Sequence, residues 1–421
     1  MPVSRKKVII VGAGFAGIQL ARNLDASLFD VLILDRLNHH QFQPLFYQVA
    51  SSQIEPSSIS FPIRNIFRGK KNVSVRMAEA ISMDEENKIL HSSIGDFAYD
   101  YLVLAMGCRT NFFGNSELEK HALPLKSTYE AIQIRNHLLE TFEKVLYASE
   151  AEKKQLLNIV IAGAGPTGVE LAGAFAEIRD HVLPKDYPGT DFSKLAIILV
   201  EGSPNTLNNM SQEAKKASAA YLREMGVDIR TNTLVKSYDG ENLLLSTGEC
   251  IPTKTLIWSA GVIANGISGL PQEAAGPANR IRVDRFSLVI GCHSVYALGD
   301  LSFMETPLYP KGHPQVANVA INQAKLLAKN LRSLEKRQPL KEYEYRDLGS
   351  MATIGTNKAV VDLPFIRFKG YPAWLVWMFL HLMLILSVKN KLFIFINWAI
   401  AYLTRNTSLR LILKNQQSAK Q

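Results

Sequence analysis

The sequence predicts an α/β chain with two Rossmann-like dinucleotide-binding domains, the second inserted in the first, and a helical C-terminal tail that associates with membranes. Two observations carry the first part of this prediction. The motif G-x-G-x-x-G occurs twice, and each copy lies between an apolar run of strand length and a helix of small residues. The third observation is a strongly apolar segment near the C-terminus, where basic residues occur without acidic ones.

The first glycine motif lies near the N-terminus, where the apolar run Val8–Val11 leads into Gly12, Gly14 and Gly17. In such a motif the first glycine makes a tight turn, the second lets the backbone approach a pyrophosphate, and the third packs the helix on the strand. The phosphates then meet the positive end of the helix. The next strand, DVLILD, ends at Asp35, where a carboxylate can bind a ribose or can simply end the strand.

The second motif is more extended and reads LNIVIAGAGPTGVE, with glycines at Gly163, Gly165 and Gly168. Its following strand, LAIILVE, also ends in an acid, Glu201. An acid at this position favours a free ribose 2′-hydroxyl and repels a 2′-phosphate. Two motifs therefore predict two dinucleotides, and the second site is expected to prefer NADH to NADPH.

Between the motifs, the loop His39–Ala50 is rich in aromatic and amide side chains. It could pack on a flat ring system or form a buried connection, and its spacing leaves both interpretations open. Short strand patterns over Asn72–Ala105 then predict a small antiparallel sheet and a last buried strand, YLVLAMG. A helix is predicted over Pro124–Glu143, with Ser127 as its N-cap and Glu130 completing a capping box.

The second half repeats this pattern. After an insertion over Arg179–Lys194, the sequence predicts a helix over Ser211–Met225, a hairpin over Asn242–Ile251 and the buried strand TLIWSAGV. Near residue 283 the chain is expected to return to the first domain. There a short strand, Tyr296–Leu298, delivers Gly299-Asp300 into a turn, which could face a ribityl chain or pyrophosphate or could be a generic turn.

The helix that follows, HPQVANVAINQAKLLAKNL, is amphipathic and is predicted to hold Gln315 in its first turn.

Composition limits the class of protein. A chain of 421 residues with 47% hydrophobic and 20% charged residues is ordinary globular protein with room for two or three domains. The net charge of +9 comes almost entirely from eight basic residues after Asp362, so the body is nearly neutral and nucleic-acid binding is not predicted. The apolar run at the N-terminus is too short for a signal peptide. Cys108, Cys250 and Cys292 are too widely spaced for a redox pair, which favours a reducing compartment.

The tail begins with Tyr371–Val388, which contains no charged residue and would span about 27 Å as a helix. Lys389 and Lys391 interrupt it, and a second apolar run, Leu392–Leu403, carries Trp398 and Tyr402. Basic residues and interfacial aromatics between apolar helices predict helices that lie in a membrane surface and contact anionic lipid. A membrane-spanning helix and an apolar dimer interface are the alternatives.

These motifs together resemble a known family. Two G-x-G-x-x-G units, a YLVLAMG strand and a YALGD strand resemble the two-dinucleotide flavoprotein reductases. Within them, FQPLFYQVA, GAGPTGVELAG, the SAGV strand end and the helix near Gln315 are similar to the type II, or alternative, NADH:quinone oxidoreductases. The resemblance covers essentially the whole chain and implies electron transfer from NADH through FAD to a membrane quinone, without proton pumping.

The resemblance also implies site residues. It assigns Glu170 and Gln315 to catalysis: Glu170 matches a glutamate near nicotinamide and flavin, and Gln315 a glutamine of the quinone pocket. A carboxylate stabilised by the helix dipole is the plain alternative for Glu170. FAD is expected at Gly12, Gly14, Gly17, Asp35 and Asp300, and NADH at Gly163, Gly165, Gly168 and Glu201. Further cofactor contacts are implied for Phe15, Ala16, Arg36, Gln48, Gly107, Val316, Pro166, Thr167, Ala260 and Gly261, and no metal site is expected.

The chain departs from the family pattern in two places. The family's A-Q-x-A-x-Q helix opening becomes PQVANV here, so Val319 replaces the second glutamine. The turn AMG also stands where related reductases have ATG. A sulfide:quinone oxidoreductase and a flavoprotein redox sensor similar to apoptosis-inducing-factor-like proteins are the alternative functions. The first needs cysteines at the flavin.

The predicted domains are an FAD-binding domain of residues 1–150 and 280–335, an NADH-binding domain of residues 155–275, and a C-terminal region of residues 336–421 with membrane-anchoring helices from about residue 371. The tail, over residues 371–414, is expected to hold the protein on the cytoplasmic face of the cell membrane as a peripheral or monotopic protein. A homodimer is also expected.

Overall fold

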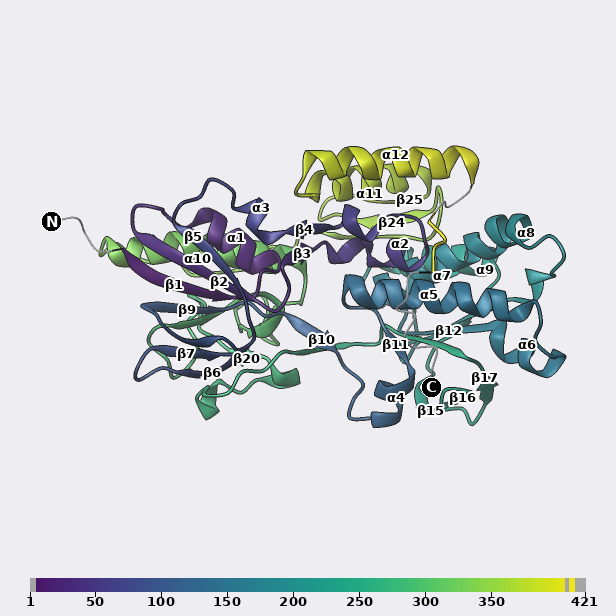
Figure 1. Cartoon of the computed structure of the whole chain (residues 1–421), viewed down its shortest axis with the longest axis horizontal. Coiled ribbons are helices and arrows are strands. Elements are labelled where there is room, and N and C mark those ends of the chain that lie inside the picture. The colour runs from purple at the N-terminus through teal and green to yellow at the C-terminus, as the bar shows by residue number, and fades with distance from the viewer. Residues whose placement is uncertain (1–4, 406–408, 413–421) are drawn as a thin grey trace. The chain divides into compact units, whose positions relative to one another are not determined.

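A computed structural model describes residues 5–405 and 409–412, so residues 406–408, 413 and 414 of the predicted tail lie outside the described residues. The chain forms two compact units (Figure 1). The first unit comprises residues 1–40, 61–109 and 262–347, and the second comprises residues 41–60, 110–261 and 348–421. Residues 110–261 of the second unit, which contain the second glycine motif, are therefore inserted in the sequence of the first unit, whereas residues 348–421 follow it. The assignment of FAD to the first domain and of NADH to the second stays a prediction.

The first unit is built on a five-stranded parallel sheet in the order β21-β9-β1-β2-β5. Its strands are β1 (Lys6–Val11), β2 (Phe29–Asp35), β5 (Val73–Met77), β9 (Tyr101–Leu104) and β21 (Val295–Ala297). The central strands are continuous runs of Val, Ile and Leu because both faces of a parallel sheet are covered.

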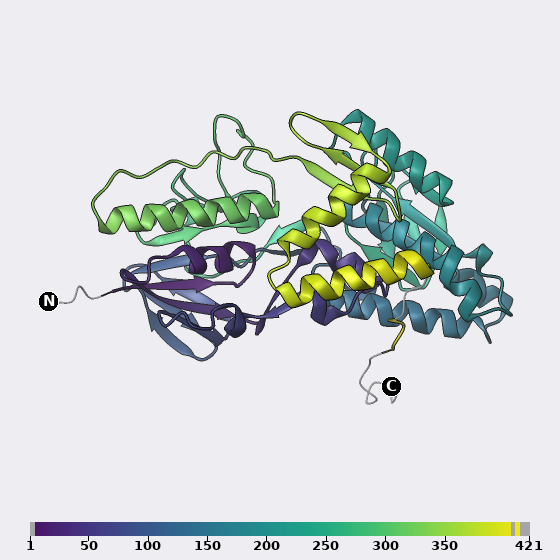
Figure 2. The ribbon, with the colours of Figure 1, turned by 90° about the horizontal axis from the view of Figure 1, so that it is seen from above.

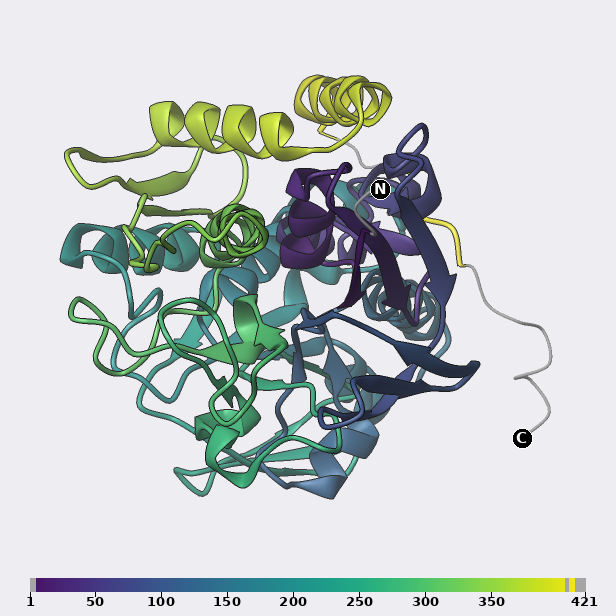
Figure 3. The ribbon, with the colours of Figure 1, turned by 90° about the vertical axis from the view of Figure 1, so that its left-hand side faces the viewer.

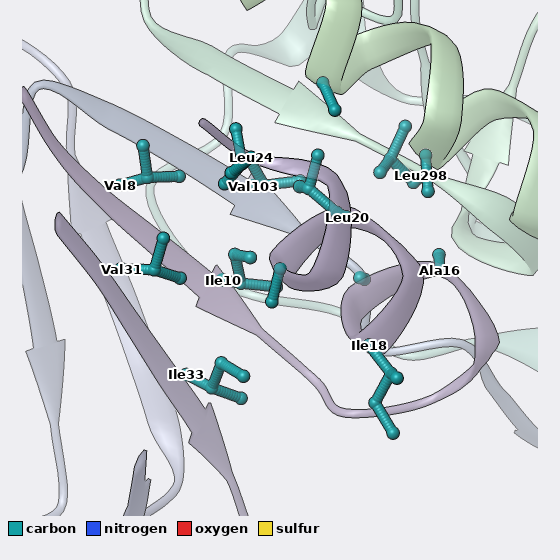
Figure 4. Close-up of a cluster of buried hydrophobic side chains, with 14 of the residues drawn as sticks. Val8, Ile10, Ala16, Ile18, Leu20, Leu24, Val31, Ile33, Val103 and Leu298 are labelled. Atoms are coloured by element: carbon teal, nitrogen blue, oxygen red, sulfur yellow. The ribbon is translucent and has the colours of Figure 1, made fainter. Parts of the chain in front are cut away.

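The two faces of this sheet hold two separate cores. Side chains of a strand alternate between faces, so Val8 and Ile10 pack against α1 (Phe15–Asn23) and α10 (Ala317–Glu335), as Figure 4 shows for α1. Ile9 and Val11 face the other core, which includes residues of an antiparallel sheet. That sheet consists of β6 (Ala80–Asp84), β7 (Ile89–Ser92) and β8 (Gly95–Ala98), and confirms the predicted one.

The second unit repeats the architecture with the parallel order β11-β18-β12-β13-β14. The strands are β11 (Leu123–Pro124), β12 (Asn158–Ala162), β13 (Ala196–Val200), β14 (Val227–Arg230) and β18 (Thr255–Trp258). Its helices are α2 (Phe46–Ala50), α4 (Ser116–His121), α5 (Thr128–Val145), α6 (Glu150–Leu156), α7 (Pro166–Glu177), α8 (Leu183–Asp186) and α9 (Gln212–Glu224). A small antiparallel sheet contains β15 (Val235–Tyr238), β16 (Asn242–Leu245) and β17 (Cys250–Pro252).

The remaining elements are short. They are β3 (His39–Gln41), β4 (Ser60–Pro62), α3 (Ile63–Ile66), β10 (Cys108–Thr110), β19 (Val262–Ala264), β20 (Ile281–Arg282) and β22 (Ser302–Phe303).

The C-terminal part of the second unit begins with a three-stranded antiparallel sheet of β23 (Ser350–Thr353), β24 (Ala359–Asp362) and β25 (Arg367–Lys369). Two helices follow, α11 (Tyr371–Leu384) and α12 (Val388–Thr404), and α11 packs on this sheet. The two helices lie next to each other in Figure 2, and Figure 3 shows α12 along its axis. No helix among the described residues is both long enough and apolar enough to cross a membrane.

Three sequence predictions about helix ends need correction. The predicted helix over Pro124–Glu143 begins at Thr128, because Leu123–Pro124 pair with β18 as β11. Ser127 caps it as predicted, but the Glu130 carboxylate accepts from the Lys126 N–H at 2.6 Å, so the capping box is not the predicted one. The apolar segment Tyr371–Val388 is not one helix, because α11 ends at Leu384 and Ser387 caps α12.

The third correction concerns Gln315, which precedes α10 instead of lying in its first turn. Val316 is extended at the N-cap position, and the Gln315 amide donates to the Asp300 carbonyl oxygen at 2.9 Å. This bond holds Gln315 before the helix, which begins at Ala317.

Candidate functional site

The first glycine turn leaves an open space at the N-terminus of α1. Gly12 has a φ of 102°, and a Cβ added there would overlap the carbonyl oxygen of Ala105. A Cβ on Gly17 would overlap the carbonyl oxygen of Gly12. A Cβ on Gly14, in contrast, would meet no protein atom within 4 Å. Gly12 and Gly17 therefore maintain the turn, whereas Gly14 leaves room at the helix end for a phosphate group.

Asp35 braces this turn. One carboxylate oxygen accepts from the Ala13 N–H at 2.6 Å and the other from the Leu37 N–H at 2.7 Å. Burial raises the pKa of Asp35, against the opposing effect of these two backbone donors. The carboxylate still has lone pairs for a ribose hydroxyl, because two oxygens offer about four acceptor positions.

Other predicted contacts differ in their surroundings. Ala16 is buried in the core, and Phe15 packs edge-on against His40 with ring centroids 5.3 Å apart. His40 also contacts the glycine turn, through Nδ1 and the Ala13 carbonyl oxygen at 2.9 Å. Arg36 is largely exposed and lies 3.7 Å from the Glu79 carboxylate.

A second group of predicted residues gathers where β21 ends. Asp300 lies in a short 3₁₀ turn; the Cys108 thiol donates to its carboxylate at 3.1 Å, and Gln315 donates to its carbonyl oxygen. The structure therefore brings Asp300 and Gln315 together. Gly107, with a φ of 64°, directly precedes Cys108, while Val316 follows Gln315 as the N-cap of α10.

Gln323, one of three amide residues (with Asn318 and Asn322) that the sequence offers in place of the family's second glutamine, supports this turn from α10. Its side-chain oxygen accepts from the Gly299 N–H at 2.7 Å and from the Ser302 hydroxyl at 3.3 Å. Val319, which stands at the family's second glutamine position, is buried in the core instead. Gln323 lies one helical turn farther along α10.

The second glycine turn has the same geometry as the first. Gly163 has a φ of 98°, a Cβ on Gly168 would overlap the Gly163 carbonyl oxygen, and a Cβ on Gly165 would meet nothing within 4 Å. Pro166 occupies the first position of α7, where its missing N–H costs nothing, and Thr167 follows. Glu201 repeats the role of Asp35, accepting from the Ala164 N–H at 2.6 Å and the Ser203 N–H at 2.7 Å.

The strand end SAGV packs directly against this turn. The Ser259 hydroxyl donates to the Ala162 carbonyl oxygen at 2.9 Å, and a Cβ on Gly163 would meet the backbone of Ser259 and Ala260 at 2.8 Å. Gly261 has a φ of 122° and lies against the ring of Phe113. Ala260 therefore lies against the second glycine turn, whereas Gly261 contacts Phe113.

Glu170 lies one turn into α7 and lines a cavity of about 640 Å³ within the second unit. It is not in the first turn of the helix, which excludes the plain helix-dipole role. Its carboxylate is buried and lies 3.5 Å from the Thr353 N–H. The other walls include Tyr47, Gln48, Trp377 and Trp398.

A chain of hydrogen bonds crosses the cavity wall. The Trp398 indole donates to the Gln48 side-chain oxygen at 2.9 Å, and the Gln48 amide donates to the Tyr47 hydroxyl at 2.9 Å. The Trp377 indole nitrogen is buried and has no hydrogen-bond partner among the described residues. The loop over residues 39–50 is therefore in part a buried connection, and in part a wall of this cavity.

Burial shifts the pKa values of Glu170 and Tyr47. It raises the pKa of Glu170 well above its ordinary value, although the Thr353 N–H opposes the rise. The pKa of Tyr47 is likewise raised by burial and by the nearby Glu170. Perturbed acids in a cavity are typical of functional sites.

We expect this burial to make folding stability depend on pH through Glu170. The folded chain keeps a proton that the unfolded chain releases above about pH 4.3, so the free energy of unfolding falls as pH rises toward the raised pKa. Glu170→Gln should remove this fall, whose slope is at most about 1.4 kcal/mol per pH unit. Urea unfolding from pH 4 to 8 measures it, with the exposed Glu224→Gln as control. Parallel curves for wild type and Glu170→Gln would contradict the burial argument.

Comparison with known proteins identifies the family. Residues 6–324 match the family model described as pyridine nucleotide-disulphide oxidoreductase, and residues 348–406 match one described as NDH2 C-terminal domain. The chain is 31% identical, over 99% of its own length and 92% of the relative's, to the type II NADH:quinone oxidoreductase Ndh of Mycobacterium tuberculosis. This chain belongs to the type II NADH:quinone oxidoreductases.

A second relative supports the family, and two solved structures share the fold. The type II NADH:quinone oxidoreductase NdhA of Mycobacterium tuberculosis is also 31% identical, over 95% of this chain and 88% of its own. The structure of NDH2 from Plasmodium falciparum in complex with NADH has a TM-score of 0.89 at 22% identity, covering 97% of this chain and 100% of that one. A sulfide:quinone oxidoreductase from Aquifex aeolicus shares the fold, with a TM-score of 0.73 at 19% identity over 95% and 96% of the two chains.

In this type II NADH:quinone oxidoreductase, one tail residue lies elsewhere than predicted. Trp398, predicted as an interfacial aromatic, is buried because its indole bonds to Gln48. His381, on α11, stacks on Trp377 with ring centroids 4.0 Å apart, and burial lowers its pKa to about 4. Sequence reasoning missed Trp377 and Thr353 as neighbours of Glu170, because an apolar tail does not reveal which of its aromatics face inward.

Proposed function

We propose that the two open glycine turns hold the two dinucleotides of an FAD-dependent enzyme that oxidises NADH and reduces a membrane quinone by two electrons, without pumping protons. The family supports the reaction. The observation that carries the assignment of sites is the repeated geometry: each unit has a glycine with open space at a helix N-terminus and an acid that ends the next strand. This arrangement suits a pyrophosphate and a ribose.

The first unit is the proposed FAD site. Gly14 offers the space for the pyrophosphate, Asp35 the acceptor for a ribose, and Asp300 the acceptor toward the ribityl part of the cofactor. The bound flavin supplies the redox chemistry, accepting a hydride from NADH and passing electrons to quinone. Gln323 and Cys108 keep Asp300 in place through the bonds described above.

The second unit is the proposed NADH site. Gly165 lies where the pyrophosphate would approach α7, and Glu201 lies at the end of β13, where it can accept from a free ribose hydroxyl. A 2′-phosphate would meet the Glu201 carboxylate and be repelled. NADH is therefore the proposed substrate in preference to NADPH.

Glu170 and Gln315 are the proposed catalytic residues. Burial raises the pKa of Glu170 and so favours the protonated carboxyl group, which would donate where quinone reduction consumes protons. The Gln315 amide is already oriented by its bond to the Asp300 carbonyl oxygen. Gln48 is also a proposed cofactor contact. The support for it is that Gln48 lines the same cavity as Glu170.

The decisive experiment is stopped-flow absorbance of the flavin in the purified protein. We expect rapid bleaching on mixing with NADH, slow bleaching with NADPH, and rapid reoxidation on adding a short-chain quinone. Bleaching without reoxidation would reject the quinone and favour the redox sensor. Bleaching by sulfide would favour a sulfide:quinone oxidoreductase.

The tail is the proposed membrane contact. On α11 and α12, large apolar side chains such as Phe379, Phe393 and Leu403 are exposed, the last to 81%, and Lys389 and Lys391 lie beside them. Exposed apolar area bordered by basic residues suits an anionic membrane surface. The cytoplasmic face is the proposed location, and a homodimer through the same surface is the alternative.

We expect the triple variant Phe379→Glu/Phe393→Glu/Leu403→Glu to lose binding to anionic vesicles. Three charges would have to enter the lipid interface, while the cavity residues Trp377 and Trp398 stay in place. Flotation with phosphatidylglycerol vesicles measures the loss. Tyr147→Glu, at a residue of the same unit that is 78% exposed, is the control and should still float. Flotation of the triple variant would refute the surface, and a change from dimer to monomer without loss of flotation would identify a dimer interface instead.

A further inference from the structure

The loop that leads from Asp300 to Gln315 is closed at its base by one arginine. Arg280 directly precedes β20, is buried, and belongs to the first unit, as the loop does. Its Nε donates to the Ser302 carbonyl oxygen at 2.9 Å, and its Nη2 donates to that oxygen and, at 3.0 Å, to the His313 carbonyl oxygen. Ser302 follows Asp300 closely and His313 shortly precedes Gln315, so the arginine fastens the two ends of the loop to each other.

The hydrogen bonds of this guanidinium go to carbonyl oxygens rather than to a carboxylate. Its Cζ also lies 5.3 Å from the centroid of the Phe303 ring. Burial lowers the pKa of Arg280, and the charge of Asp300 opposes this effect. A buried charge is tolerated where its donors are satisfied. The planar fork of an arginine reaches both carbonyls at once, which neither a lysine nor a glutamine reproduces.

The middle of the loop is held by other contacts. The Nε2 atom of His313 lies 3.2 Å from the Thr306 hydroxyl oxygen, and this hydroxyl donates to the Glu344 carboxylate. The backbones of Thr306 and Tyr309 exchange hydrogen bonds at 3.2 and 3.0 Å. We therefore expect the loop to keep its own fold when Arg280 is replaced, and to lose the fixed alignment of its two ends.

The two ends of the loop carry proposed redox-site residues. The Gln315 amide donates to the Asp300 carbonyl oxygen at 2.9 Å. Only Pro314 separates Gln315 from His313, so a shift of the His313 carbonyl would move the Gln315 side chain. In an active site a displacement of about 1 Å can lower the rate about a hundredfold. The two bonds from Arg280 therefore control the placement of Gln315.

We propose that Arg280 is a positioning residue for quinone reduction, which aligns Gln315 with Asp300 through the carbonyl groups of Ser302 and His313. Arg280 acts through Gln315 and contacts no reacting atom itself. The inference rests on the proposed function, in which Gln315 serves the quinone. Flavin reduction by NADH, which the proposed function assigns to the glycine turn of the second unit, should not depend on this alignment.

The test is a double-mutant cycle on the full-length FAD-loaded protein, with the variants Arg280→Gln, Gln315→Leu and both together. The flavin is reduced with NADH, and its reoxidation by decylubiquinone is followed by stopped-flow absorbance. We expect each single variant to reoxidise at least about tenfold more slowly than wild type. The double variant should be no slower than Gln315→Leu, because Arg280 acts through Gln315. Bleaching of Arg280→Gln by NADH should be as fast as in wild type.

Two further variants complete the series. Arg280→Lys keeps the charge without the fork, so its reoxidation should be faster than that of Arg280→Gln and slower than that of wild type. Arg282→Gln is the matched control, because Arg282 lies on the same ring, with Cζ 5.4 Å from the Phe303 centroid. Its link to the loop is an exposed ion pair with Glu305 at 3.4 Å, a contact of little energetic weight. This control should match wild type in both half-reactions.

The cycle separates alignment from general damage to the flavin site. Additive losses in the double variant, or equal slowing of bleaching and reoxidation in Arg280→Gln, would overturn the proposal. So would slow reoxidation of Gln315→Leu together with a wild-type rate in Arg280→Gln, which leaves the proposed function intact. Unchanged reoxidation of Gln315→Leu would instead refute the proposed role of Gln315, and this inference with it. If Arg280→Gln purifies without FAD, Arg280→Lys takes its place in the cycle and the same comparison decides.

Discussion

Gly165→Val should abolish reduction of the flavin by NADH and leave the FAD content unchanged. The backbone at Gly165 has a φ of −69°, so a valine fits the chain without strain. Its side chain would fill open space at the N-terminus of α7, where a pyrophosphate would approach the helix. We expect the second-order rate constant for flavin reduction to fall by at least about a hundredfold, equivalent to about 2.8 kcal/mol.

Gly189→Val is the matched control for this prediction. Gly189 belongs to the same unit, and a Cβ there also meets no protein atom within 4 Å. Stopped-flow reduction of this control should match wild type. A Gly165→Val protein that reduces its flavin at the normal rate would remove NADH from the second glycine turn.

Gly14→Val should yield a folded protein that purifies without FAD. As at Gly165, the valine side chain would occupy open space at a helix N-terminus, here that of α1, and would leave the backbone bonds of the turn intact. Absorbance at the flavin bands, relative to protein, measures the loss, and far-ultraviolet circular dichroism verifies the fold.

Gly17→Ala separates this effect from damage to the turn. Its Cβ would overlap the Gly12 carbonyl oxygen, so we expect a loss of stability of about 1–3 kcal/mol or more, as for overpacked cores, together with the loss of FAD. Gly165→Val serves as the second comparison, because it should retain FAD. If Gly14→Val retained FAD and Gly165→Val lost it, the assignment of the two cofactors to the two units would be reversed.

The two sheets could be predicted from sequence because their strands are regular. Val8–Val11 and Ile159–Ala162 are buried on both faces, so every residue is apolar and the glycine turns mark their ends. Asp35 and Glu201 could be placed at strand ends for the same reason. Their bonds to the N–H groups of Ala13 and Ala164 could not, because they depend on the fold of each turn.

Predictions failed where a side chain from a distant part of the sequence decides the local structure. Gln315 leaves the helix pattern because its amide binds the Asp300 carbonyl oxygen. Trp398 turns inward because Gln48, 350 residues earlier, offers an acceptor. Arg135 has the helical spacing of a core residue, and only its packing shows that the core leaves it unpaired.

The contact between α7 and the sheet of β23, β24 and β25 links the second glycine turn to the tail. Gly173 of α7 lies so close to residues 354 and 355 that a Cβ there would come within 3.0 Å of their backbone, and Thr353 reaches Glu170 on the same helix. The helix that borders the second glycine turn and the sheet that precedes the tail are therefore joined as one body. With the tail held on lipid as proposed, that turn stays at a fixed height above the bilayer. The protein would then act as a phase-transfer catalyst: it would take NADH from water and pass the electrons to a quinone that stays in the lipid.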